Sequence, residues 1–124
     1  MDDHRREERG AVLVEFALIL PVLLMLLVGI IEFGRAYNTT VSMQSAAREG
    51  ARELALRRSA AEVEQAVRDA APSVEIDAVA QDPCPATGDG EAEVFVTEDF
   101  TFGIPFVDLG TKTLSATGVM RCGL

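Results

Sequence analysis

The sequence predicts an α+β fold in which one long N-terminal helix carries a small sheet domain. Three observations support this prediction. An apolar run of about twenty residues lies near the start, a helical periodicity of three and four residues follows it, and a strand-like period of two begins after Pro72. We expect a transmembrane helix that continues into an extramembrane helix, then a second short helix and a small three-stranded antiparallel sheet.

The apolar run covers residues 11–31, with the sequence AVLVEFALILPVLLMLLVGII. As a helix it would span about 30 Å, the thickness of the bilayer hydrocarbon. A buried helix of a soluble protein is the alternative, but a helix that is apolar on every side needs a larger core than the rest of this chain can build. We therefore interpret residues 11–31 as a transmembrane helix, and Pro21 within it predicts a kink.

The positive charges around this segment predict its orientation. Arg5, Arg6 and Arg9 precede it, whereas only Arg35 follows closely. The positive-inside rule then places residues 1–10 in the cytoplasm as a leader and exports the rest of a single-pass protein of the cell (inner) membrane. A cleaved secretory signal is the competing interpretation. The run is long for a signal core, however, and its end, GIIEFGRAY, offers no convincing small-residue cleavage site.

Residues 32–71 are predicted to be helical and to form a stalk followed by a second helix. Small residues recur along the stalk at helical spacing, which allows another element to approach closely. The partner of this stripe is either the protein's own sheet or a neighbouring helix, and both remain open. The residues concerned are Ala47, Gly50, Ala51 and Ala55.

The second helix is predicted from a capping box at Ser59 and Glu62, and Pro72 ends it. Residues 72–124 form the predicted exported sheet domain, with alternating strands at 74–78, 92–97 and 112–121. Its phenylalanines are expected in the core or on a sheet face, whereas an exposed cluster around Gly103-Ile104-Pro105 would mark a contact surface. They are Phe95, Phe100, Phe102 and Phe106.

Cys84 and Cys122 both lie on the predicted exported side, where disulfides persist. We expect one intramolecular bridge that ties the last strand to the sheet and adds about 2–4 kcal/mol of stability. Free thiols or an intermolecular link are the alternatives. The acidic loop at 88–91 is read as a hairpin connection, because it lacks the regular ligand spacing of a calcium loop.

Composition makes several functions improbable. The chain has 11 Lys and Arg against 20 Asp and Glu, a net charge of −9, which argues against nucleic acid as a partner. It has one His, and no cluster of residues assembles a familiar catalytic or metal site. A hydrolase using carboxylates such as Asp77 or Glu91 has no support in their spacing. We expect no enzymatic activity, no cofactor and no small-molecule substrate.

The junction between leader and membrane segment carries the most specific pattern. Gly10 stands at the membrane edge, Ala11 follows it, and Glu15 is the lone carboxylate of the apolar run, followed by Phe16. A carboxylate near the centre of a membrane helix costs roughly 2.5–3.5 kcal/mol, and less near an interface. Glu15 therefore either serves a purpose or reaches toward the headgroups as part of a plain membrane anchor.

This junction, the stretch GAVLVEFALILPVLLMLLVGIIEFGRAY and the small residues around AAREGARELA resemble the TadE-like pseudopilins of Flp/Tad-type type IV pilus systems. The resemblance implies that a prepilin peptidase cuts between Gly10 and Ala11. It further implies that Glu15 meets the new Ala11 amine of a neighbouring subunit in the assembly. The implied partners are the lipid bilayer, the peptidase, other pilin-like subunits, a platform membrane protein and an assembly ATPase.

Phe16 and the length of the chain favour a minor pseudopilin over the main fibre subunit, because related major pilins often carry Tyr at that position and are usually shorter. A membrane-anchored extracytoplasmic binding module with no pilus role is the alternative function. It would use the apolar helix only as an anchor.

Overall fold

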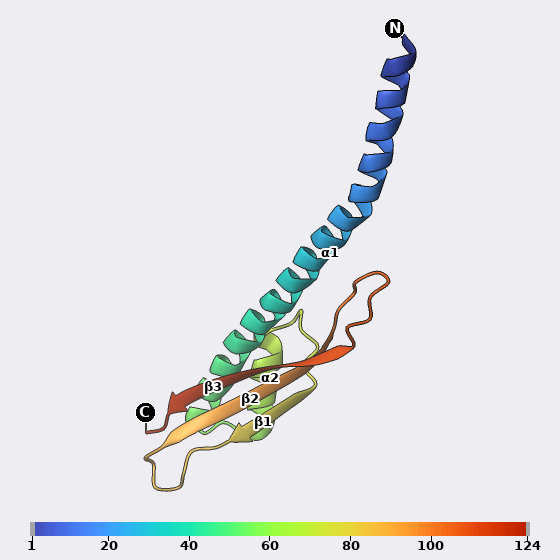
Figure 1. The fold of residues 1–124 in the computed structure, drawn as a ribbon. Coiled ribbons are helices and arrows are strands. Elements are labelled where there is room, and N and C mark those ends of the chain that lie inside the picture. The colour runs from blue at the N-terminus through green and yellow to red at the C-terminus, as the bar shows by residue number, and fades with distance from the viewer. Residues whose placement is uncertain (1, 124) are drawn as a thin grey trace.

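The computed structural model describes residues 2–123, with side chains from residue 5 onward. Met1 and Leu124, the outer ends of the predicted leader and sheet domain, lie outside the described residues, as does the side chain of His4. The fold is α+β, as predicted: helices α1 and α2 are followed by three strands. Figure 1 shows α1 as a long rod with the remaining elements gathered around its C-terminal half.

Helix α1 runs without a break over Asp2–Ala55, so the predicted membrane helix and its extension form one element. Pro21 lies inside it. Proline cannot donate the backbone hydrogen bond of a helix, and its ring crowds the preceding turn. Figure 1 shows that α1 is bent in its N-terminal, blue half, as a proline in this stretch predicts.

Helix α2 covers Ala60–Ala70 and begins with the predicted capping box. The Glu62 amide donates to Ser59 Oγ at 3.3 Å, and the Ser59 amide donates to Glu62 Oε2 at 2.9 Å. These bonds satisfy amides that a helix start otherwise leaves without a partner. The helix buries Val63 and Val67 against α1.

The sheet has the order β1-β2-β3, and both pairs are antiparallel. Strand β1 covers Ala78–Asp82, so the predicted strand at 74–78 is wrong in position. The alternation there reflects burial of Ile76 and partial burial of Val74 in a connection that precedes β1. Arg68 Nη1 donates to the Ile76 carbonyl at 2.9 Å, which links this connection to α2, and only at Asp77 does its backbone reach β2, where the Asp77 amide donates to the Thr97 carbonyl at 3.0 Å.

Strands β2, Glu91–Thr101, and β3, Thr111–Arg121, are longer than predicted but keep the predicted alternation. Ala92, Val94 and Val96 of β2 are fully buried, on the face that α1 and α2 cover. On the other face, the side chain of Phe95 is 42% exposed. The core therefore lies between the two helices and one face of the sheet.

The predicted disulfide is present between Cys84 and Cys122. Cys84 lies in the connection between β1 and β2, which confirms the hairpin reading of the acidic loop, and Cys122 directly follows β3. The Cys122 amide also donates to the Gly90 carbonyl at 2.9 Å. Both contacts hold the C-terminal end of β3 against this hairpin.

Candidate membrane helix and its boundary with the sheet domain

The N-terminal half of α1 stands free of the rest of the chain. Every described side chain from Arg5 to Leu27 is exposed, although most of them are apolar. Among the described residues, one helix is long and apolar enough to cross a membrane, and its apolar stretch is not buried in the protein. This exposure excludes the core helix of a soluble protein, and the segment is compatible with a single-pass membrane anchor.

The predicted processing junction is helical and lies in this free half. A side chain added at Gly10 would meet no atom within 4 Å, and Ala11 is exposed beside it. Glu15 is exposed on the apolar stretch, and none of the ion pairs among the described side chains includes it. Phe16 is 60% exposed. Glu15 therefore has no ion-pair partner among the described side chains.

The stripe of small residues lies in the other half of α1 and is covered. Ala47, Ala51 and Ala55 are buried in the core together with residues of α2 and the sheet. Gly50 faces Val67 and Val94, and a side chain there would overlap Val67. Of the two partners left open by the sequence, the chain's own domain occupies this stripe.

At the boundary between the two halves, Glu32 connects α1 to the end of the sheet. Arg35 Nη1 donates to both carboxylate oxygens of Glu32, at 2.7 and 2.8 Å, and the Gly103 amide donates to Glu32 Oε2 at 2.7 Å. Glu32 is the buried charged residue of the described chain, with 6% of its surface exposed. The Gly103 amide and the Arg35 guanidinium lower the pKa of the Glu32 carboxyl.

Two aromatic rings complete this contact. The Arg35 guanidinium carbon lies 5.2 Å from the centre of the Phe100 ring, within the range of a cation–π contact. Phe102 meets Phe100 edge to face, with 5.0 Å between ring centres. Phe100 is therefore a core residue, as expected, whereas Phe102 is only half-buried.

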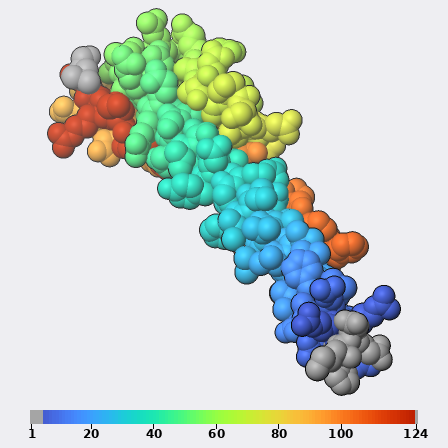
Figure 2. Space-filling view, turned by 90° about the horizontal axis from the view of Figure 1, so that it is seen from above, coloured from blue at the N-terminus to red at the C-terminus, as the bar shows by residue number. Residues whose placement is uncertain are grey.

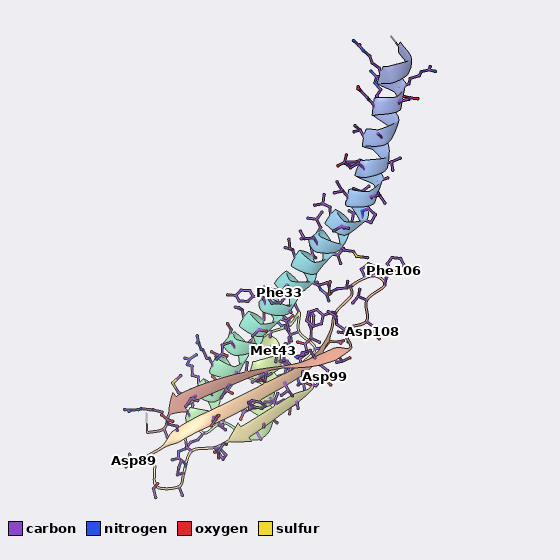
Figure 3. All side chains as sticks on the ribbon, in the orientation of Figure 1. Phe33, Met43, Asp89, Asp99, Phe106 and Asp108 are labelled. Carbon is purple, nitrogen blue, oxygen red and sulfur yellow. A yellow bond between two sulfur atoms is a disulfide. The ribbon has the colours of Figure 1, made fainter. Side chains whose placement is uncertain are left out.

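The connection between β2 and β3, residues 102–110, extends from this contact toward the free half of α1. In Figure 3, Phe106 lies at the far end of the connection and Asp108 lies nearer the sheet. Phe106 is 98% exposed, so the prediction of a core or sheet-face position is wrong for this residue. Together with Pro105 it lines a groove of about 370 Å³ whose other wall belongs to α1: Pro21, Leu24, Met25 and Val28.

Sequence reasoning did not single out Glu32 as a contact residue, and it used Arg35 only to orient the helix. A signal was present, because an acid and a base three residues apart are neighbours on a helix surface. This pair directly follows the apolar run. The contact from Gly103, 71 residues away in sequence, could not be read from local spacing.

The family model described as TadE-like protein matches residues 10–52. Comparisons with curated proteins and with solved structures gave no match. The matched segment starts at the predicted processing glycine and includes most of the free half of α1, Glu32 and most of the small-residue stripe. Residues 10–52 are thus TadE-like in sequence, which is consistent with a member of the TadE-like family.

Proposed function

We propose that this chain is a minor pseudopilin that assists assembly of a Flp/Tad-type type IV pilus. It is anchored in the cell (inner) membrane with residues 1–10 in the cytoplasm, and the domain around the C-terminal half of α1 is exported. A prepilin peptidase cuts after Gly10, and the mature chain starts at Ala11. Its role is structural, with no enzymatic activity. Its partners are other pilin-like subunits and the platform proteins of the system.

The exposed Glu15 is the observation that carries this proposal. An ionised carboxylate on an apolar membrane helix is costly unless a positive group meets it. No ion pair of the described side chains includes Glu15, which supports a compensating charge from another molecule. Cleavage after Gly10 would create such a charge, the free amine of Ala11.

The helical spacing supports a pairing between subunits. Ala11 and Glu15 are four residues apart, or about 6 Å along the axis. A neighbouring helix shifted by about one turn would bring its Ala11 amine level with Glu15. The uncovered surface of residues 5–27 leaves room for such a neighbour, whereas the small-residue stripe is already occupied.

N-terminal sequencing of the membrane-bound protein tests the processing step. In cells that hold the peptidase, we expect the mature chain to begin at Ala11. Gly10→Leu should leave the leader attached, because a bulky side chain hinders close approach of the peptidase to the backbone. Gly29→Leu is the matched control, since Gly29 also has open space around it and lies away from the junction. An intact leader on the wild-type chain would contradict the proposal.

A second experiment tests the role of Glu15 after processing. Glu15→Gln should be inserted in the membrane and trimmed, but should fail to support filaments, counted by electron microscopy of sheared cell fractions. Glu8→Gln in the leader is the control for loss of one carboxylate. Normal filament numbers with both Glu15→Gln and Gly10→Leu would leave only the anchored binding module.

A further inference from the structure

The tip of the β2–β3 connection, residues 104–107, is apolar and largely exposed. Its four residues Ile104, Pro105, Phe106 and Val107 form a continuous apolar stretch, and polar residues resume at Asp108. Phe106 is almost fully exposed and Val107 is 42% exposed. Such a cluster is unfavourable in water and marks a surface that contacts something else.

The position of this stretch along α1 indicates what it contacts. The groove that Pro105 and Phe106 share with α1 is lined by residues from Pro21 to Val28. These lie four to eleven residues before Glu32, which is roughly 6–16 Å along the helix. Figure 2 shows the orange connection beside the blue part of α1, on the N-terminal side of the sheet domain. The tip is thus level with residues that are predicted to lie within the bilayer.

The flanks of the connection remain at the level of the boundary. The Gly103 amide is hydrogen-bonded to Glu32. Leu109 lines a second groove with Phe102 and with Phe33 and Tyr37, which follow Glu32 along α1. The Glu32 contact therefore fixes how far the connection reaches along α1. In Figure 3, Phe106 lies at the far end of the connection, whereas Asp108 lies nearer the sheet.

The backbone of the tip also suits a shallow apolar environment. Backbone amides without partners are costly in lipid. Pro105 has no amide hydrogen, and the Val107 amide donates to the Ile104 carbonyl, although the bond is long at 3.4 Å. Of the backbone amides in the tip, only those of Ile104 and Phe106 then have no hydrogen-bond partner among the described residues. This favours insertion at the interface, where apolar segments reach about 5–10 Å into the boundary of headgroups and acyl chains.

We propose that residues 104–107 insert into the outer leaflet of the membrane that α1 spans, as a second contact of the exported domain with lipid. The inference rests on the proposed membrane placement of α1, but not on processing or on a pilus role. It follows that the exported domain is held at the bilayer surface by two contacts, α1 and this tip, with Glu32 and Gly103 joining them.

Single tryptophans provide the test, because the chain has no natural Trp. Full-length Phe106→Trp is reconstituted into phosphatidylcholine vesicles, with or without bromine near the start of the acyl chains. We expect a blue-shifted emission and loss of most of the fluorescence in brominated vesicles. Circular dichroism and the Cys84–Cys122 bridge report whether each variant is folded.

Two matched tryptophan variants provide the positive and the negative control for quenching by brominated lipid. Leu18→Trp, on the exposed apolar part of α1, should be quenched by the brominated lipid, and Phe95→Trp, on the open face of the sheet, should not. If Leu18→Trp is quenched but Phe106→Trp behaves like Phe95→Trp, the tip does not meet lipid. If the emission of Phe106→Trp is blue-shifted but not quenched, and an added chemical cross-linker joins the variant to a second copy, a protein contact replaces the lipid contact. Failure of Leu18→Trp itself would overturn the membrane placement of α1.

Discussion

The carboxylate of Glu32 accepts a hydrogen bond from the amide of Gly103 at 2.7 Å, which joins α1 to the end of β2 across 71 residues of sequence. Arg35 neutralises the charge of the same carboxylate. The pairing leaves Glu32 with partners on both oxygens while it is almost fully buried. The β2–β3 connection is therefore positioned by a charged contact in addition to the packing of Phe102 on Phe100.

We predict that Glu32→Gln loosens this connection. The neutral amide loses the attraction to Arg35 and accepts a weaker bond from Gly103. Hydrogen exchange should become several-fold faster at the Gly103 amide while the core of β2 is unchanged. Glu49→Gln is the matched control, because Glu49 also pairs with an arginine three residues later but contacts no distant backbone. Equal exchange at Gly103 in both variants would contradict the role given to Glu32.

Loss of the disulfide should destabilise the sheet domain by about 2–4 kcal/mol, because the reduced chain gains freedom in the unfolded state. The bridge spans a separation of 38 residues and fastens the end of β3. Pulse proteolysis in urea of the full chain in detergent micelles measures the change for Cys84→Ser/Cys122→Ser. Reductant should lower the stability of the wild-type chain and leave this variant unaffected. A reductant effect on both would show that the bridge is not the cause.

Much of the fold could be predicted because its signals are local. The length of the apolar run, the capping box at Ser59 and the alternation of Ala92, Val94 and Val96 each depend on neighbours in sequence. The first strand was misplaced for the same reason. Burial of Ile76 gives a strand-like pattern, but strand pairing depends on partners in β2 that a local pattern does not identify.

The candidate site likewise has some features that local sequence predicts and others that depend on long-range contacts. The apolar character of the membrane segment and the unusual Glu15 are visible in the sequence, because composition alone reveals them. The covering of Ala47, Gly50 and Ala51 could not be decided from spacing, since a stripe of small residues suits a sheet as well as a helix. The exposed position of Phe106 depends on where the Glu32 contact holds the connection, which is a long-range property.

We expect the ionisation of Glu98 to change the free energy of unfolding with pH in the opposite direction to the ionisation of Glu32. Burial, followed by the charges of Asp77 and Glu75, raises the pKa of the Glu98 carboxyl, and Glu98 Oε2 is buried without a hydrogen-bond partner among the described residues. A carboxyl whose pKa is higher in the folded than in the unfolded state lowers the free energy of unfolding as the pH rises through the folded-state pKa. For Glu32, whose pKa is lowered, stability is instead lost as the pH falls through the folded-state value.

Glu98→Gln should therefore be more stable than the wild-type chain at neutral pH, and this advantage should disappear below the unfolded-state pKa of a glutamate. Urea unfolding at a series of pH values measures the difference. Glu93→Gln is the control on the same strand, because Glu93 is exposed and its substitution removes the same charge. An advantage of Glu98→Gln that does not change with pH would mean that ionisation of Glu98 is not its source.

Gly118 on β3 sets how closely α1 can approach the sheet. A Cβ there would overlap the backbone carbonyl of Ala47, which cannot move aside as a flexible side chain can. Gly118→Ala should therefore destabilise the domain by about 1–3 kcal/mol, as overpacking of a filled core does. The hydrogen bond that Gln44 Nε2 donates to the Thr117 carbonyl at 2.7 Å reports the separation of α1 and β3, because it forms only while helix and strand remain close.

Gly34→Ala is the matched control, because Gly34 lies on α1 with open space around it. There the alanine should be neutral or stabilise the helix by up to about 1 kcal/mol, since glycine is a poor helix former. Pulse proteolysis of the full chain in micelles compares the two variants. If Gly118→Ala were as stable as Gly34→Ala, α1 could move away from the sheet at no cost. The free half of α1 would then not be held in a fixed direction relative to the sheet domain.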